Sequence, residues 1–418
     1  MMTKENIKKL CEEAKAASRE LALIDTKTKN KAIIAMSRAL LNNAYYILRE
    51  NNKDVINARR EGLTPALIDR LTLDKKRLVA MADSLAEISK LKDPVGGVIE
   101  SVKRPNGLVI KKVRVPIGVI LIIYESRPNV TSDCIGLCLK SANAIILRGG
   151  SEAVNSNIAI FEVLHKEAVK NKIPAAAISI IRDTNRRIVD ELLCQEGRID
   201  LVIPRGGESL IREVSKKSRI PVIKHYKGVC HTYIDRTADL KMAEDISFNA
   251  KVQRPGVCNA METLLVDKAI AKKFLPNMIK RFKDAGVEIR GSVEVRSIVK
   301  GVRLATEEDW YTEYLDLILS VRVVNGVDEA IRHVMKYGSF HSDAIVTRSK
   351  SNADKFLKEV DSACVYVNAS TRFTDGAEFG KGAEMGISTD KIHARGPMGL
   401  EELTSYKYVV RGNGQVRK

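Results

Sequence analysis

The chain has 418 residues, a formal net charge of +18, 44% hydrophobic residues and only 5% aromatic ones. Its length predicts roughly two to three domains of ~150 residues, and without an apolar run of ~18 residues or an amino-terminal signal core we expect a soluble, cytoplasmic protein with no membrane partner. Acidic residues are interleaved with the basic ones, stacking side chains are scarce and no nucleic-acid-binding motif appears, so we expect anionic metabolites and no nucleic acid as ligands.

The first part of the chain is expected to be helical, because apolar residues recur at helical spacing from residue 3 to about 90. The pattern changes near 93–94. Two β-like runs, 98–101 and 108–115, then flank the dipeptide Asn106-Gly107. Asn-Gly is a strong hairpin signal, so these residues predict a β-hairpin.

Two series of apolar strands that alternate with helices follow. The first is expected to have strands at 118–124, 144–147, 178–181, 201–203 and 222–223, and helices at 131–141, 152–170, 184–195 and 207–217. The second, from about residue 245, is expected to have strands at 263–266, 287–290, 317–324, 344–346 and 365–367, and helices at 268–284, 327–336 and 351–360. This alternation predicts βαβ units and parallel sheets. The tail, 404–410, alternates polar and apolar residues as an edge or intersubunit strand does.

Cys258, in the run QRPGVCNAMETLL (253–265), is the candidate nucleophile. It follows the turn 255–257 and precedes an apolar strand, where a thiol can face a cleft beside free backbone N–H groups. Two nearby cations, Arg254 and Lys251, would favour the reactive thiolate. The alternative is a buried structural cysteine, which is common for free cysteines. The seven cysteines are odd in number and scattered, so we expect reduced thiols and no disulfide framework.

Two Arg-Gly-Gly turns, 148–150 and 205–207, stand where an expected strand passes into an expected helix. Backbone N–H groups at a helix start and an arginine fork both bind phosphate, so the pair of turns predicts a dinucleotide phosphate site. The alternative is that these glycines only form turns, and the G-x-G-x-x-G fingerprint is missing. Asn129, between a strand and a helix, is either an oxyanion donor or a helix cap, and its spacing favours the cap. The six histidines show no metal-ligand spacing, so no metal site is expected.

Seven blocks resemble, in order, the aldehyde dehydrogenase superfamily and most closely its gamma-glutamyl phosphate reductases. The blocks are YESRPNVT (124–131), ILRGGSEA (146–153), IPRGGESL (203–210), QRPGVCN (253–259), YGSFHSDAIVTR (337–348), VYVNASTRFTDGAEFG (365–380) and HARGPMGLEELTSYKY (393–408). The resemblance implies an α/β fold with two Rossmann-like domains and a small β oligomerisation element. It places an NADP-binding domain at 1–96 and 116–246, a catalytic domain at 247–385, and the oligomerisation hairpin and tail at 97–115 and 386–418.

The same resemblance implies a role for individual residues. Cys258 is expected as the nucleophile and Asn129 as the oxyanion donor. The cofactor-binding residues are expected to be Arg148, Gly149, Gly150, Ser151, Arg205, Gly206, Gly207 and Glu313, the last of which would hold the nicotinamide ribose. Arg127, Arg254 and Arg372 are the candidate substrate-binding residues. The cofactor is expected to be NADPH, with Arg148 near its 2′-phosphate.

The implied activity is the NADPH-dependent reduction of L-glutamyl 5-phosphate to L-glutamate 5-semialdehyde and phosphate through a cysteine thioester, the second step of proline biosynthesis. Other aldehyde dehydrogenases carry a glutamate base within the stretch that corresponds to 223–235. Here His225 lies near that position and no carboxylate does, which fits phosphate rather than water as the second nucleophile. A homo-oligomer is expected, with glutamate kinase as a further candidate partner. The alternatives are a hydrolytic or CoA-acylating aldehyde dehydrogenase and a non-catalytic binding protein of the same fold.

Overall fold

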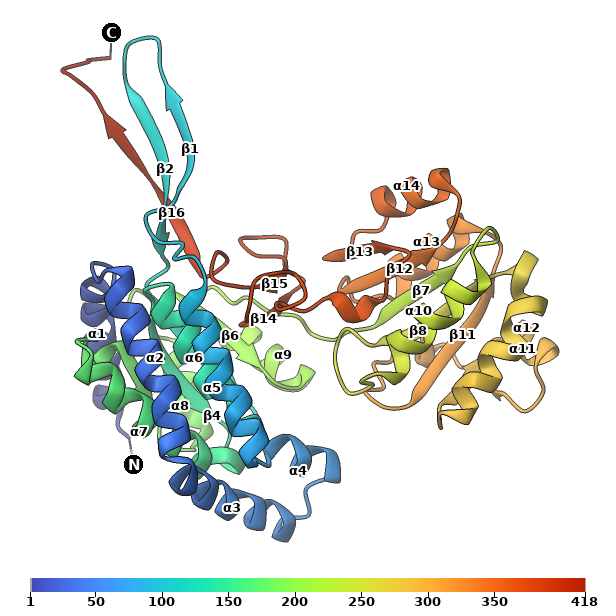
Figure 1. Ribbon diagram of the computed structural model, residues 1–418, viewed down its shortest axis with the longest axis horizontal. Helices are drawn as coiled ribbons and strands as arrows, with labels where there is room; N and C mark the ends of the chain where they lie inside the picture. Colours follow the sequence, from blue (N-terminus) through green and yellow to red (C-terminus); the bar gives the residue numbers. More distant parts are fainter. Residues whose placement is uncertain (1, 418) are drawn as a thin grey trace. The chain divides into compact units, whose positions relative to one another are not determined.

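The structure of the protein is a computed structural model that describes residues 2–417. Its chain forms two compact units. Unit 1 holds the residues up to Lys224, together with Gly380–Gly386 and the chain from Met398 onward, and unit 2 holds His225–Phe379 and Ile387–Pro397. In Figure 1 the blue and green helices belong to unit 1, and most of the yellow and orange elements belong to unit 2. Within the described residues, no helix is long and apolar enough to cross a membrane.

Unit 1 begins with the predicted helical region. Its helices are α1 (Lys4–Leu21), α2 (Thr26–Asn42), α3 (Ala44–Arg60), α4 (Pro65–Leu71) and α5 (Lys75–Lys90). Thr3, Asp25 and Asp74 cap α1, α2 and α5, because each side-chain oxygen accepts a backbone N–H of the first turn. Pro65 begins α4, a position where its missing N–H leaves no hydrogen bond unmade.

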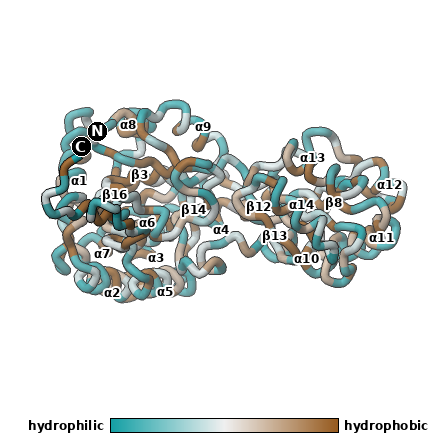
Figure 2. Tube along the Cα trace, turned by 90° about the horizontal axis from the view of Figure 1, so that it is seen from above, coloured by the Kyte–Doolittle hydropathy of each residue, from teal (hydrophilic) through white to brown (hydrophobic). Residues whose placement is uncertain are grey.

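A four-stranded parallel sheet forms the centre of unit 1, in the order β5-β4-β3-β6. Its elements are β3 (Val119–Tyr124), α6 (Asn129–Lys140), β4 (Ala144–Gly149), α7 (Val154–Lys170), β5 (Ile178–Ile180), α8 (Arg186–Leu193), β6 (Leu201–Arg205) and α9 (Glu208–Lys217). Every residue of β3 is buried, and the trace is hydrophobic there in Figure 2, as expected for a strand covered on both faces. Since β4 and β6 both pair with β3, their glycine turns flank Tyr124 at one edge of the sheet.

The predicted hairpin and tail combine in a separate three-stranded antiparallel sheet of unit 1. Its strands are β1 (Val98–Lys103), β2 (Val109–Pro116) and β16 (Thr404–Arg411), with β2 in the middle. The tail strand pairs with β2 along its whole length, from Thr404 opposite Pro116 to Arg411 opposite Val109. This sheet projects from the helices of unit 1 (Figure 1), and Tyr406, Tyr408 and Val410 are exposed on it.

Unit 2 contains a seven-stranded parallel sheet in the order β10-β9-β11-β8-β7-β12-β13. Its elements are β7 (Cys230–Ile234), α10 (Leu240–Val252), β8 (Met261–Asp267), α11 (Lys268–Asp284), β9 (Glu288–Gly291), α12 (Val293–Ile298), β10 (Arg303–Leu304), β11 (Ile318–Val324), α13 (Val327–Tyr337), β12 (Ser342–Val346), α14 (Lys350–Glu359) and β13 (Cys364–Val367). Alternate residues of β8 face opposite sides, so Leu264 packs in the core with α10 and α11 and Leu265 in the core with α13 and α14.

The α/β fold class, with two parallel sheets and a small antiparallel one, is confirmed, but several details differ from the prediction. Residues 222–223 form no strand, and Val222 makes only an isolated bridge to Val202. Strand β7 was not predicted, because its polar sequence CHTYI gives no apolar run although all its residues are buried. The division between the units falls after Lys224 rather than after 246, since β7 and α10 belong to unit 2, and the segment 387–397 also belongs to unit 2.

Candidate active site

Cys258 lies on the turn that connects α10 to β8, in unit 2. Its side chain is half-buried, so the alternative of a fully buried structural cysteine does not apply. Of the other six cysteines, Cys194 is exposed and the rest are buried. None of the seven forms a disulfide, as the sequence predicted.

The backbone of this turn is held in place from two sides. Gly228 packs directly against it, because a Cβ at that position would lie 1.9 Å from the carbonyl oxygen of Cys258. The Cys230 thiol donates to the same carbonyl oxygen at 3.2 Å. On the other side, Thr371 donates to the carbonyl oxygen of Asn259 at 2.7 Å. The nucleophile therefore sits on a backbone with little freedom to shift.

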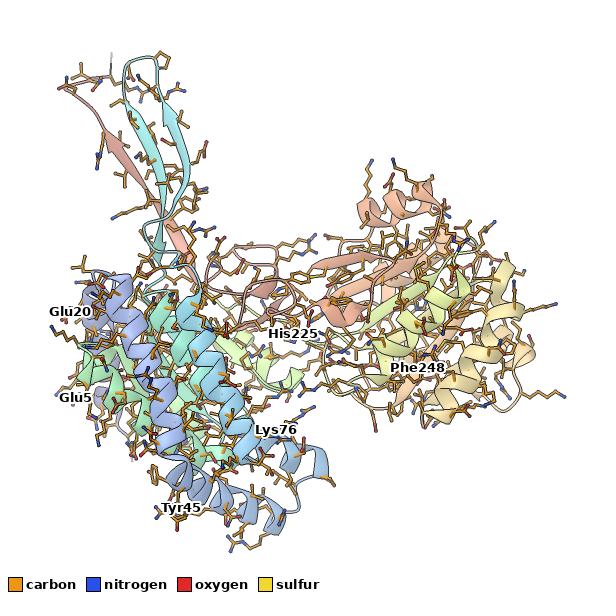
Figure 3. The ribbon with its side chains drawn as sticks, in the orientation of Figure 1. Glu5, Glu20, Tyr45, Lys76, His225 and Phe248 are labelled. Atoms are coloured by element: carbon orange, nitrogen blue, oxygen red, sulfur yellow. The ribbon has the colours of Figure 1, made fainter. Side chains whose placement is uncertain are left out.

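Two histidines lie beside the thiol. Cys258, His225 and His341 come just before β8, β7 and β12, which are neighbours in the parallel sheet and begin at the same edge. Their sulfur and ring nitrogen atoms lie within 4.8 Å of one another, and the two imidazole rings meet edge to face at 5.7 Å. Figure 3 labels His225, the first residue of unit 2. Spacing along the sequence gave no sign of this cluster.

One of the two cations expected near the thiol is paired with a carboxylate. Lys251 is completely buried and its amino group lies 2.6 Å from the equally buried carboxylate of Glu262, so its charge is compensated. Burial lowers the pKa of Lys251 and raises the pKa of Glu262 to about 7. Arg254 is exposed. Arg372 is half-buried, and burial lowers its pKa while a negative charge on Cys258 acts in the opposite direction.

Arg372 is held by its own hydrogen bonds to the turn that connects α10 to β8. Its Nε donates to Gln253 at 2.7 Å, and its guanidinium also donates to the side-chain oxygen of Asn259. Asn259 in turn donates to the carbonyl oxygen of Thr374 at 2.7 Å. These bonds hold Arg372, a predicted substrate-binding residue, near Cys258, whose charge acts on it.

Glu313 also reaches the segment that supports the thiol. Its carboxylate accepts the backbone N–H of Gly228 at 2.9 Å. The neighbouring Leu315, with a positive φ of 55°, donates its N–H to Glu262 at 3.2 Å. The carboxylates of Glu313 and Glu262 therefore each accept a backbone N–H of the protein.

In unit 1, Arg148 is the penultimate residue of strand β4 and is buried. Its guanidinium donates to the carbonyl oxygens of Thr184 at 2.7 Å and Gly149 at 3.1 Å, and burial lowers its pKa. Gly150 donates its N–H to Tyr124, so this N–H belongs to the sheet edge. Ser151, the next residue, is exposed and begins a 3-10 turn (Ser151–Ala153) before α7.

The second Arg-Gly-Gly turn, 205–207, binds the carboxylate of Glu125. The Gly207 N–H, at the start of α9, donates to the carboxylate of Glu125 at 2.8 Å. A Cβ at Gly206 would lie 2.3 Å from the same carboxylate, so glycine is needed for this close approach. Because the amino end of a helix favours negative charge, Glu125 stands where a phosphate would bind. Arg205, before the turn, lies close against Gly386 of the same unit.

Asn129 and Arg127 belong to the loop and helix start after β3. Asn129 is exposed and is the first residue of α6, where its amide donates to Asp133 at 3.1 Å rather than capping the helix. Burial raises the pKa of Asp133. Arg127 is half-buried, and its backbone oxygen accepts the N–H of Val130. The capping role that spacing favoured for Asn129 is therefore wrong.

Two α/β units, each with a parallel sheet, and a half-buried thiol on a fixed turn are the features of the aldehyde dehydrogenase class. The model of the aldehyde dehydrogenase family matches residues 1–295. The gamma-glutamyl phosphate reductase of Caldanaerobacter subterraneus subsp. tengcongensis is 59% identical over 97% of this chain and 98% of its own length. That of Thermodesulfovibrio yellowstonii is 57% identical over the full length of both. The chain thus belongs to the aldehyde dehydrogenase family and, within it, to the gamma-glutamyl phosphate reductases.

Solved structures agree with this assignment. The crystal structure of gamma-glutamyl phosphate reductase from Thermotoga maritima has a TM-score of 0.96 and 49% identity, and covers 99% of this chain and 100% of its own. The acetylating aldehyde dehydrogenase of Geobacillus thermoglucosidasius has a TM-score of 0.72 at 18% identity and covers 99% and 98% of the two chains, which shows a shared fold.

Proposed function

We propose that the protein reduces L-glutamyl 5-phosphate to L-glutamate 5-semialdehyde and phosphate, with NADPH as the reductant, in proline biosynthesis. The observation that carries the proposal is full-length identity above 55% to gamma-glutamyl phosphate reductases. The accessible thiol of Cys258, beside two histidines and Arg372, supports it chemically.

The first step is nucleophilic attack by the Cys258 thiolate on the carbonyl carbon of the acyl phosphate. A C–S bond forms, the C–O bond to phosphate breaks, and phosphate leaves. The fixed turn holds the sulfur in one place, which favours attack because positioning supplies much of the rate of such reactions. Arg254 and Arg372 are proposed to bind the anionic groups of the substrate, and the assignment of Arg127 to substrate binding stays a prediction. The assignment of Asn129 as an oxyanion donor stays a prediction.

NADPH, when bound, supplies the hydride that reduces the thioester to a thiohemiacetal. Collapse of the thiohemiacetal then breaks the C–S bond and releases the aldehyde and the Cys258 thiol. This step moves a proton between oxygen and sulfur. His225 and His341 stand beside the sulfur and are proposed to carry that proton, since histidine is the commonest general acid and base in enzymes.

The glycine turn before α9 fits a phosphate of the cofactor. Gly206 and Gly207 already accommodate a carboxylate there, so an anion of that kind can reach the backbone N–H once Glu125 moves aside. Arg205 and the residues 148–151 are proposed as further cofactor contacts, and Glu313 as the partner of the nicotinamide ribose. The preference for NADPH over NADH, with Arg148 near the 2′-phosphate, follows from the family resemblance.

Phosphate is proposed as the acceptor in the reverse reaction, in place of water. A water-activating carboxylate would have to be available near the thiol, but Glu262 pairs with Lys251 and Glu313 accepts the Gly228 N–H. The second candidate function is that of a hydrolytic or CoA-acylating dehydrogenase. The third candidate is a non-catalytic binding protein of this fold.

The test is NADP reduction by glutamate semialdehyde, with and without phosphate, for the wild type and Cys258→Ser. Turnover that requires phosphate and is lost in the variant supports the proposal. Turnover in water alone supports a hydrolytic enzyme, and strict dependence on CoA supports an acylating one. Cofactor binding with no turnover under any condition supports a binding protein.

We also propose that the protein is a cytoplasmic homo-oligomer assembled through the sheet β1-β2-β16. The exposed aromatic residues Tyr406 and Tyr408 on β16 support this, because exposed apolar side chains that cluster on one strand mark contact surfaces. An interaction with glutamate kinase, which would supply the acyl phosphate, stays a prediction.

A further inference from the structure

The cluster of His225, Cys258 and His341 has the composition of a metal site. One thiol and two imidazoles, with ligand atoms within 4.8 Å of one another, come from three separate parts of the sequence. Thiolate and imidazole are the ligands that Zn²⁺ binds most readily. Three protein ligands with the fourth position open to water are also a known arrangement for zinc.

The geometry allows an ion with only a small closure of the cluster. Zn–S bonds of ~2.3 Å and Zn–N bonds of ~2.0–2.1 Å place tetrahedral ligand atoms roughly 3.4–3.6 Å apart. The three atoms therefore have to approach one another by up to about 1.4 Å. His225 can move because it lies on a segment without helix or strand, whereas Cys258 stands on a fixed backbone and adjusts only by rotation of its side chain. His341, directly before β12, is the fixed member.

His341 is already oriented by a chain of hydrogen bonds. The Nδ1 atom of His341 lies 2.9 Å from the Ser342 hydroxyl, which is 2.7 Å from that of Thr374. Metal-binding imidazoles are usually held in this way through their second nitrogen, which fixes the ring and its tautomer. In this orientation Nε2 of His341 is the atom that coordinates the ion.

We propose that unit 2 binds a thiophilic divalent cation such as Zn²⁺ through Cys258, His225 and His341, and that the ion reversibly blocks the thiol. Binding forms one Zn–S bond and two Zn–N bonds, and the thiol proton is released to solvent, so no oxidation or reduction takes place. A sulfur bound to the ion cannot attack a carbonyl carbon. The binding itself stands on the geometry of the cluster, whereas its effect on activity rests on the proposed role of Cys258.

Co²⁺ is the probe for this site, because a cobalt–thiolate bond gives a charge-transfer absorption that reports the sulfur ligand directly. The full-length protein carries Cys194→Ser, which leaves Cys258 as the accessible thiol of the described chain. We expect one Co²⁺ per chain, displaced by Zn²⁺. His225→Asn and His341→Asn should each weaken binding by at least about 100-fold, above the 10–100-fold for loss of an outer partner. Cys258→Ser should abolish the charge-transfer band.

His165→Asn is the matched control, since His165 lies on α7 of unit 1 and its loss should leave Co²⁺ affinity unchanged. His225→Asn changes a half-buried residue outside regular structure, so it remains informative if His341→Asn fails to fold. Unchanged affinity in His225→Asn, or no charge-transfer band in protein with Cys258 intact, overturns the site.

Activity is measured separately on metal-free protein. Inhibition by Zn²⁺ that a chelator reverses is the expected result. If Co²⁺ binds with the expected ligand dependence while metal-free protein does not reduce glutamyl phosphate, the proposed function fails and the metal site stands. If metal-free protein is active and no Co²⁺ binds, the metal site alone is wrong.

Discussion

Substitution of Gly228 by alanine should displace the backbone that carries the nucleophile. The added Cβ would lie 1.9 Å from the Cys258 carbonyl oxygen and 2.6 Å from its Cα, whereas ordinary contacts are 3.4 Å or longer. Both partners are backbone atoms, so no flexible side chain can move away. One of the two segments must therefore shift by about 1.5 Å.

The expected effect is larger on catalysis than on folding. A displacement of about 1 Å at the reacting atom lowers the rate by roughly 100-fold, so kcat/KM should fall by about that factor or more. Overpacking of this kind typically lowers the free energy of unfolding by about 1–3 kcal/mol, which a folded domain of this size tolerates. The same shift should also disturb the hydrogen bond from Gly228 to Glu313.

The assay combines steady-state kinetics with the rate at which iodoacetamide alkylates Cys258, and thermal unfolding checks the fold. Gly399→Ala is the control, because the three atoms nearest to its Cβ would be side-chain carbons of Lys381 at 3.0–3.5 Å, so a shift of only a few tenths of an ångström is needed. A Gly228→Ala protein with wild-type kcat/KM would refute the reasoning. Loss of activity through unfolding alone would refute it as well.

Three further outcomes follow from the Lys251–Glu262 pair, from His333 on α13 and from Glu125. Lys251→Met leaves the Glu262 carboxylate buried without its partner and should lower the free energy of unfolding by about 3–5 kcal/mol. The double variant Lys251→Met/Glu262→Leu should regain most of that stability. Urea denaturation measures the free energy of unfolding of both variants. Burial lowers the pKa of His333 from 6.5 to about 2, so below pH 6.5 the unfolded chain binds a proton that the folded one does not. Stability should then fall by about 2 kcal/mol between pH 6.5 and 5, and by less in His333→Phe. Glu125→Gln replaces the charged acceptor at Gly207 with a neutral one, so NADP should bind about 5-fold more tightly in a fluorescence titration.

Each of these outcomes has a clear contrary result. A double variant as unstable as Lys251→Met would mean that lost packing, rather than the unpaired carboxylate, lowers stability. An identical pH profile in His333→Phe would assign the acid sensitivity to other groups. Unchanged or weaker NADP binding in Glu125→Gln would show that the carboxylate does not compete with the cofactor.

Local patterns in the sequence were enough for most of the fold. Helix α11 was predicted at its observed bounds, and the Asn106-Gly107 turn joins the two predicted strands of the hairpin. Strand β7 was missed because its burial depends on a distant partner: the backbone N–H and ring Nδ1 of His231 both bond to Asp343 at 2.8 Å. A polar strand satisfied in this way carries no local hydrophobic signal.

The site was predictable only in part, because contacts between distant parts of the chain leave no local signal in the sequence. Cys258 was found from its turn and its strand, which are local features. Lys251 looked like a free cation because its partner Glu262 stands on the next element, and charge pairing across elements cannot be read from spacing. The histidine cluster follows from the neighbouring positions of β7, β8 and β12, so the signal was present only once β7 had been placed in the sheet.

The pairing of the tail with the hairpin has a consequence for the order in which the protein is completed during synthesis. Strand β2 finds its partner β16 only when residues 404–411 have left the ribosome, and buried Asn143 bonds to the carbonyl oxygen of Leu403 at 2.8 Å. Until then β2 presents an unpaired edge, the kind of surface on which nascent chains aggregate. Unit 1, although most of its residues are made first, therefore reaches its final structure last.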